Sequence, residues 1–283
     1  MSKLKRVLAI NDVSCVGRCS LTVALPIISG AGIECSVLPT AVLSTHTGGF
    51  SGYTVKDLDD QILPIANHWI KENISFDCMM SGYLASSGQI DKIKEVFKMF
   101  KNEKNIIIVD PTMADNGKLY PAFDDHFPKE MAKLVSISDI CIPNITEACL
   151  LAGIEYKEGV NTKEYYESLL VALHLLGAKN VVLTGVSLNF GMIGVAVLEN
   201  GNVSYYQEEK VPYSFHGTGD VYGACFASAI VSGFSIFDSA KIASNITKKA
   251  ILETISSSTD SKFGVNFECI INDLYVRLRG ESE

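Results

Sequence analysis

The chain has 283 residues, of which 47% are hydrophobic and 20% are charged, and this is enough for one large α/β domain with a sizeable core. Its formal net charge of −8 argues against a nucleic-acid partner, so any phosphate site has to be local. No stretch approaches the roughly 18 apolar residues of a membrane span, and the apolar run after the basic N-terminus is too short for a signal peptide. The eight cysteines form no CxxC pair, which indicates reduced, buried thiols in a cytoplasmic protein.

Strands and helices alternate along most of the chain. This alternation predicts a single α/β domain over residues 1–283, with a mostly parallel central sheet and helices on both faces. The predicted strands are 7–10, 35–42, 76–84 (running into a turn), 105–110, 139–142 and 180–185, followed by a hairpin of 191–198 with 203–206 around Asn200-Gly201. The predicted helices are 18–29 (bent or broken near Pro26), 57–73, 88–100 (capped by Ser86), one that starts near Asn144, 162–176, one that follows the loop 217–220, and those from 236 onward.

Polar residues recur where the predicted strands end, which is the edge of an open α/β sheet where ligands bind. Asp110, for example, ends the clearest buried strand of the chain and is followed by a proline. Several such positions on one edge, with a phosphate-type loop among them, predict a nucleotide site. They are Asp12, Asp110, Asn144 with Glu147, Thr184, and the loop 217–220.

Two of these positions also have a purely structural interpretation. Asn144 can cap the helix that follows it, and Glu147 in the first turn favours the helix dipole, so capping alone explains both residue types.

His46 lies in a polar, glycine-rich loop over residues 43–53, where a histidine by itself indicates an exposed loop residue.

Gly217-Thr218-Gly219-Asp220 opens a segment of small and apolar residues with helix composition. A glycine loop before a helix directs several backbone N–H groups one way, at the positive end of the helix dipole, and so forms an anion site. Asp220 either caps this helix or accepts a proton beside a bound phosphate, and the spacing allows both. The chain has no GxxxxGK[ST] loop and no GxGxxG at its first helix, which argues against P-loop proteins and dinucleotide reductases.

The motifs together resemble those of the ribokinase-like kinases, most closely the pyridoxal/pyridoxamine kinases, over nearly the whole chain. Gly217–Asp220 resembles their anion hole, and Ser81-Gly82-Tyr83-Leu84 and Pro143–Glu147 match their SGYL and PNxxE motifs. Further similar segments are Gly17–Pro26, Leu43–Thr47 (SNHT in the family) and Val109–Met113 (containing DPVM in the family).

The resemblance implies ATP-dependent phosphorylation of a hydroxymethyl group on a small heteroaromatic alcohol, with Mg²⁺ and possible use of a monovalent cation, by a homodimer. Asp220 would be the catalytic base, and the N–H groups of Gly217, Thr218 and Gly219 would bind the developing charge. The metal would be positioned, partly through water, by Asp110, Asn144 and Glu147. The nucleotide would meet these three residues together with Thr184, Gly185, Gly217 and Gly219. The substrate would meet Asp12, His46, Thr47, Tyr83 and Asp220.

Two departures leave the substrate open. Pyridoxal kinases usually have serine where this chain has Asp12, and Asp12 with His216 is similar to the hydroxymethylpyrimidine kinases of thiamine synthesis. Those kinases, however, usually carry cysteine where this chain has Asp220. We hypothesise that Asp12 pairs with a protonated ring nitrogen or an amine, which would favour pyridoxamine or pyridoxine over pyridoxal.

Three alternatives to a B6-vitamer kinase follow from the sequence. The first is a hydroxymethylpyrimidine (phosphate) kinase. The second is a non-catalytic vitamer- or nucleotide-binding protein, against which the intact Asp220 argues. A sugar kinase is disfavoured, because the chain lacks the N-terminal lid sheet that resemblance to sugar kinases would predict.

Overall fold

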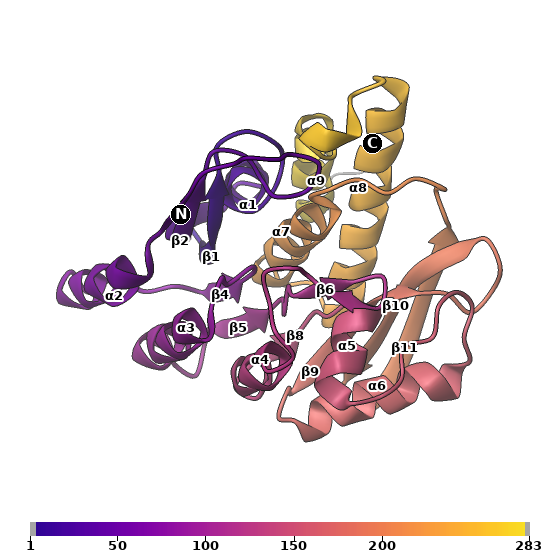
Figure 1. Cartoon of the computed structure of the whole chain (residues 1–283), viewed down its shortest axis with the longest axis horizontal. Coiled ribbons are helices and arrows are strands. Elements are labelled where there is room, and N and C mark those ends of the chain that lie inside the picture. Colours follow the sequence, from indigo (N-terminus) through magenta and orange to yellow (C-terminus); the bar gives the residue numbers. More distant parts are fainter. Residues whose placement is uncertain (1–3, 281–283) are drawn as a thin grey trace.

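A sheet of nine strands runs through the computed structural model, which describes residues 4–280 (Figure 1). Its strand order is β11-β10-β9-β8-β5-β4-β1-β2-β3. The strands are β1 (Arg6–Ser14), β2 (Glu34–Leu43), β3 (Val55–Asp57), β4 (Cys78–Ser81), β5 (Ile106–Val109), β8 (Ile140–Cys141), β9 (Asn180–Val186), β10 (Met192–Glu199) and β11 (Asn202–Glu209). A separate two-stranded ribbon pairs β6 (Ala114–Asp115) with β7 (Lys118–Leu119).

The centre of the sheet is parallel. Every neighbouring pair from β9 through β8, β5, β4 and β1 to β2 is parallel, whereas β10, β11 and β3 add antiparallel strands at the two edges. In β1, residues 7–10 are buried on both faces of the sheet, as expected for a strand covered by helices on both sides. The predicted mostly parallel α/β architecture is therefore confirmed.

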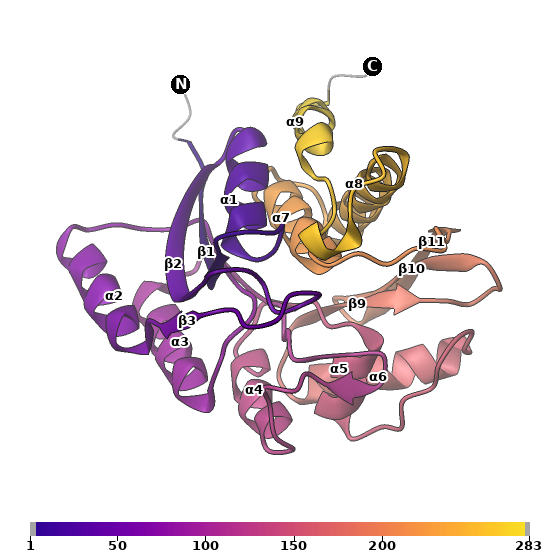
Figure 2. The same cartoon turned by 45° about the horizontal axis from the view of Figure 1, so that its top comes forward.

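Helices cover both faces of this sheet (Figure 2). One buried cluster packs the sheet against α2 to α6, and a second packs it against α1, α7, α8 and α9. The helices are α1 (Leu21–Gly30), α2 (Ile62–Lys71), α3 (Ser87–Phe100), α4 (Phe127–Val135), α5 (Ile145–Ala152), α6 (Lys163–Leu175), α7 (Thr218–Val231), α8 (Ile236–Ser256) and α9 (Ile271–Leu278), with 3₁₀ turns at Asp59–Gln61, Ser261–Phe263 and Glu268–Ile270. None of these described helices is long and apolar enough to cross a membrane.

Several local predictions are confirmed. The Asn200-Gly201 turn joins β10 to β11 with positive φ at both residues, 51° and 80°, as a tight hairpin turn requires. Ser86 caps α3, as predicted, by accepting a hydrogen bond from the Gln89 N–H. Thr162, for which no cap was predicted, caps α6 in the same way.

Two boundaries differ from the predictions because tertiary pairing and loop geometry override local pattern. β1 does not end at Ile10 but continues to Ser14, since residues 13 and 14 still pair with β2. The next helix begins at Leu21 and not near Arg18, because Gly17 and Ser20 both have positive φ. It continues past Pro26 to Gly30.

The predicted helix 57–73 was also too long. Val55–Asp57 form the short strand β3 against β2, a 3₁₀ turn follows, and α2 covers only Ile62–Lys71.

The strand order decides where the site lies. β9, β8, β5, β4 and β1 are consecutive neighbours in the sheet. Because these strands are parallel, their carboxyl ends lie along one edge. The polar residues that follow them therefore share that edge.

The close approach of β10 and β11 gives a test of the fold. A Cβ on Gly194 would overlap the carbonyl oxygen of Tyr206 on the paired strand. We expect Gly194→Ala to lower the free energy of unfolding by about 1–3 kcal/mol, the usual cost of overpacking. Gly88→Ala is the matched control, because a Cβ there makes only ordinary contacts. Equal melting temperatures for the two variants would contradict the β10–β11 register.

Candidate active site

The carboxyl end of β1 carries two consecutive buried polar residues. The pairing of β1 with β2 shifts register between Asn11 and Val13, so a bulge surrounds Asp12. Bulges of this kind re-aim side chains and are common beside active sites. Asp12 is only 4% exposed, and its two carboxylate oxygens accept hydrogen bonds from the hydroxyls of Ser20 (2.6 Å) and Ser14 (3.1 Å). Burial raises the pKa of Asp12, and the two serines oppose that rise.

The glycine loop before α7 has the geometry of a helix start without a side-chain cap. Gly217 is the N-cap residue in the left-handed conformation, with φ of 80°, and a Cβ there would overlap the Arg18 carbonyl oxygen. The Thr218 hydroxyl donates to the carbonyl of Phe215 at 3.2 Å. In the described chain no side chain caps α7, so the capping interpretation of Asp220 is wrong. The first N–H groups of a helix have no partner within it, so this loop offers donors to an anion.

Asp220 lies in the first turn of α7, partly buried and facing β1. Asn11 Nδ2 donates to Asp220 Oδ1 at 3.4 Å, and the Ser20 backbone N–H opposes a rise in the pKa of this carboxylate. Burial raises the pKa of Asp220 to about 7, helped by the negative charges of Asp12 and Asp110. A carboxylate with such a pKa accepts a proton near neutral pH, which is what a general base requires.

A second pair of carboxylates lies farther along the same edge. Asp110 follows β5 and accepts a hydrogen bond from the Thr112 hydroxyl at 2.8 Å. Glu147 in α5 is 3% exposed, and its two oxygens accept the backbone N–H groups of Asn144 (2.8 Å) and Met113 (3.1 Å). Burial raises the pKa of Asp110 to about 7. Burial and the Asp110 charge together raise the pKa of Glu147.

Asn144 is engaged at both ends of its amide. Its Oδ1 accepts the Glu147 N–H at 2.9 Å, completing a capping box at the start of α5, and its Nδ2 donates to the Ala114 carbonyl at 2.8 Å. The predicted capping role is thus present. Across residues 4–280, no group of three or more His, Cys, Asp or Glu side chains is arranged to hold a metal ion. Glu147, which is buried, and Asp110, which is partly buried, nevertheless form an all-oxygen pair of mutually repelling carboxylates, which fits a hard cation such as Mg²⁺ held partly through water.

The end of β9 lies beside Asn144. Thr184 donates to the Pro143 carbonyl from both its N–H (2.9 Å) and its hydroxyl (3.3 Å), and a parallel bridge joins Thr184 to Asn144. Gly185 is exposed, with φ of 81°. These two residues extend the polar edge by one strand.

His46 is buried, so the expectation of an exposed loop histidine is wrong. The side chain is 5% exposed, its Nδ1 accepts the Gly48 N–H at 3.2 Å, and its Nε2 therefore donates to the Lys262 carbonyl at 2.7 Å. Its ring lies 5.2 Å from that of His216. Burial lowers the pKa of His46, and the hydrogen bond to Lys262 ties this loop to the C-terminal segment. Its neighbour Thr47 is exposed.

Tyr83 follows β4 and is partly buried, with its ring 5.5 Å from that of Phe123. Burial, with a contribution from the Asp12 charge, raises the pKa of its hydroxyl to about 12. Tyr83 is therefore a neutral group on the same edge as Asp12.

Comparison with known proteins fits this arrangement. The family model described as phosphomethylpyrimidine kinase matches residues 27–264. The chain belongs to that family. It is therefore a kinase of the ribokinase-like superfamily that the motifs indicated, a phosphotransferase acting on an alcohol group.

Three relatives illustrate the substrates named for similar proteins. A pyridoxal kinase structure from Lactobacillus plantarum is 30% identical, covers 99% of this chain and 100% of its own, and superimposes with a TM-score of 0.90. A candidate phosphomethylpyrimidine kinase from Bacteroides thetaiotaomicron, crystallised with pyridoxal, is 32% identical over 96% of both chains, also with a TM-score of 0.90. The hydroxymethylpyrimidine/phosphomethylpyrimidine kinase of Bacillus subtilis is 26% identical over 76% of this chain and 78% of its own. Both substrate classes are thus represented among the family members that this chain resembles.

Sequence reasoning missed two residues at the site of this kinase, Asn11 and Ser20. Asn11 stands next to Asp12 in the same polar run, which was a usable signal. The contact of Ser20 with Asp12 depends on an unusual backbone conformation that the sequence does not reveal.

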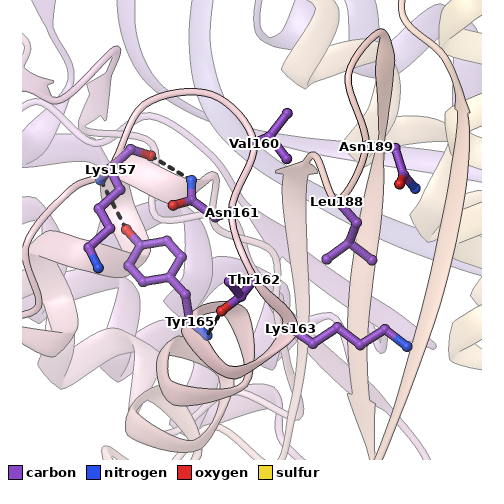
Figure 3. A pocket seen from close by; sticks show the side chains of 8 residues that line it. All are labelled: Lys157, Val160, Asn161, Thr162, Lys163, Tyr165, Leu188 and Asn189. Carbon is purple, nitrogen blue, oxygen red and sulfur yellow. Dashed lines mark hydrogen bonds between the residues drawn. The ribbon is translucent and has the colours of Figure 1, made fainter.

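A separate cavity of about 590 Å³ opens between the segment before α6 and the β9–β10 connection (Figure 3). None of the candidate site residues of the kinase lines it. Polar groups at its wall already bond one another: Asn161 Nδ2 donates to the Lys157 carbonyl at 3.0 Å, and the Lys157 N–H donates to the Tyr165 hydroxyl at 3.1 Å. The lining residues are Lys157, Val160, Asn161, Thr162, Lys163, Tyr165, Leu188 and Asn189.

The geometry of Asn144 predicts that its main contribution is structural. Asn144→Ala should lower the free energy of unfolding of this kinase by at least about 1 kcal/mol, because the α5 cap is lost. The apparent Mg²⁺ affinity, measured from nucleotide binding at increasing Mg²⁺, should change little. Thr162→Ala, which removes the α6 cap, is the matched control. A much larger loss of Mg²⁺ affinity in Asn144→Ala than in the control would instead make the amide a metal ligand.

Proposed function

We propose that this kinase transfers the γ-phosphoryl group of ATP to the 5′-hydroxymethyl group of a vitamin B6 vitamer: pyridoxal, pyridoxamine or pyridoxine. The observation that carries the proposal is the position of Asp220 in the first turn of α7. It follows the Gly217–Gly219 donors directly, and its pKa is raised to about 7. The 32% identical relative crystallised with pyridoxal supports the choice of a B6 vitamer.

In this mechanism Asp220 accepts the proton of the substrate hydroxymethyl group as its oxygen attacks phosphorus. The backbone N–H groups of Gly217, Thr218 and Gly219 donate to the oxygens of the transferring phosphoryl group. Phosphoryl transfer needs little covalent assistance, so positioning and charge stabilisation by these groups account for most of the catalysis. The left-handed Gly217 aims the donors, and for steric reasons only glycine fits beside Arg18.

The nucleotide side of the site would be formed by Asp110, Glu147, Thr184 and Gly185. Mg²⁺, when bound, would neutralise phosphate charge and shield Asp110 and Glu147 from each other. Of the two carboxylates, Asp110 would be the one more available to the metal, because both oxygens of Glu147 already accept backbone N–H groups. Asn144 would act by capping α5 with its side chain and by holding Glu147 in place through its backbone N–H.

The substrate side would be formed by Asp12, Thr47 and Tyr83, with His46 holding the loop that carries Thr47. Each oxygen of Asp12 already accepts one serine hydroxyl, so Asp12 would meet a ring nitrogen or amine through its remaining lone pairs. We further propose that the kinase acts as a homodimer.

Phosphorylation of hydroxymethylpyrimidine is the second candidate function. It is favoured by the description of the matching family model and by the acidic residue at position 12. The carboxylate at position 220 favours the B6 reading, because hydroxymethylpyrimidine kinases usually have cysteine there.

Turnover of ATP with Mg²⁺, measured in parallel with the three B6 vitamers and hydroxymethylpyrimidine, tests the proposal. We expect the highest kcat/KM with a B6 vitamer. Preference for the pyrimidine would overturn the assignment, and turnover of none of them would move the protein to the non-catalytic class.

Removal of the base tests the mechanism. Asp220→Asn should lower kcat by about 10²–10⁴-fold, the usual contribution of a general base, and leave nucleotide affinity nearly unchanged. Asp238→Asn is the matched control, since Asp238 also lies in the first turn of a helix, α8. If Asp220→Asn lost both nucleotide binding and turnover while Asp238→Asn kept both, the Asp220 carboxylate would instead support the structure of the loop.

A further inference from the structure

Ser20 has a backbone conformation that only glycine adopts without strain. Its φ is 59° and its ψ is −134°, and its side chain is 7% exposed. An antiparallel bridge to Val13 in β1 fixes it there. Local strain of this kind persists only where the surrounding structure enforces it, and it concentrates at functional sites.

Ser20 also lacks the capping hydrogen bond that a serine at its position usually makes. It is the N-cap residue of α1, where a serine oxygen normally accepts a backbone N–H, yet it makes no such bond. Its hydroxyl instead donates to Asp12 at 2.6 Å, while its backbone N–H stabilises the ionised Asp220 carboxylate and lowers its pKa. The strained turn therefore directs the two donors of one residue at two different carboxylates.

Asn11 supplies a second donor from a different element. Its Oδ1 accepts the Asp12 N–H at 2.9 Å, and this bond orients the amide so that Nδ2 faces Asp220 Oδ1 at 3.4 Å. A Cβ on Gly82 would overlap this amide, so the glycine of β4's end makes room for it. Asn11 is 7% exposed.

We propose that Asn11 and Ser20 are positioning residues that hold the Asp220 carboxylate toward the substrate hydroxyl, and that Ser20 links its position to that of Asp12. The inference rests on the proposed function, because it takes Asp220 to be the base. Asn11 donates from β1 and Ser20 from the start of α1, and both elements lie opposite the first turn of α7. A substrate that moves Asp12 would move Ser20, and through it the base.

The two residues are neutral donors in an acidic setting. Among the described residues, the titratable groups that interact with Asp220 include Asp12, Asp110, Tyr120 and Cys19. Each hydrogen bond to an ionised carboxylate stabilises the charged form, so its removal should raise the pKa of Asp220 further.

The activity test uses Asn11→Ala and Ser20→Gly. Glycine accepts the backbone angles of Ser20 and keeps the N–H, so this variant removes only the hydroxyl and the restraint on the backbone. Asn11→Ala should lower kcat about tenfold, the effect of one hydrogen bond to a charged group. Ser20→Gly frees the backbone that aims its N–H at Asp220 and should lower kcat to a similar extent. In both variants KM for the vitamer and affinity for nucleotide should stay within about twofold of wild type. Gly82→Ala, which displaces Asn11 without altering it, should reproduce the Asn11→Ala result.

Ser14→Ala is the control, because Ser14 donates to Asp12 but makes no bond to Asp220. Unchanged kcat in Asn11→Ala and Ser20→Gly would overturn the proposal. Equal losses of kcat in Ser14→Ala and Ser20→Gly would overturn the proposed link between Asp12 and Asp220 through Ser20, since both variants would then act only by altering Asp12.

A second measurement does not depend on turnover. The ¹³C resonance of the Asp220 carboxyl, assigned with Asp220→Asn, is titrated in the full chain without ligands. It should titrate near pH 7 in wild type and higher in Asn11→Ala. Identical titration in the two proteins would overturn the role of Asn11, even if wild type turned over a B6 vitamer. Absence of turnover with the expected titration would overturn the proposed function and leave the network standing.

Discussion

Four carboxylates along one edge of a sheet, two buried and two partly buried, are the constraint on which this structure depends. Asp12, Asp110, Glu147 and Asp220 each have a raised pKa because burial removes them from water. Within residues 4–280 no Lys, Arg or His forms an ion pair with any of them. Hydroxyl, amide and backbone N–H donors stabilise them instead. Such a site favours the binding of a proton or a hard cation. In phosphoryl transfer a base accepts a proton from the attacking hydroxyl, and a metal ion neutralises phosphate charge.

The parts of this site that the sequence predicted are those fixed by chain order and strand patterning. Asp12, Asp110 and Thr184 follow buried strands, and parallel pairing brings the ends of neighbouring strands to one edge whatever the details of packing. The glycine loop was predictable from local sequence as well, since glycines before a helix permit the left-handed backbone angles that such a turn requires and other residues avoid. The helix that it opens, α7, packs against α1, α8 and the sheet.

The parts that the sequence did not predict depend on contacts between distant segments. His46 is buried because the carbonyl of Lys262 and the ring of His216 close over it, and both lie more than a hundred residues away. Asn144 and Glu147 were predicted as metal-positioning residues, but in the structure they form the capping box of α5. Glu147 also accepts the Met113 N–H, and Asn144 donates to the Ala114 carbonyl. The strained backbone of Ser20 is enforced by β1 and the bulge at Asp12, which no local pattern encodes.

Asp220 is proposed to be a base whose protonation controls turnover, and the pH dependence of kcat/KM with the preferred vitamer tests this most directly. The base must be ionised to accept a proton, so kcat/KM should fall as the pH drops through about 7, the raised pKa of Asp220. The residual activity of Asp220→Asn should lack this decline. A decline only near pH 4, where an ordinary exposed carboxyl titrates, would contradict the account, as would the same decline in Asp220→Asn.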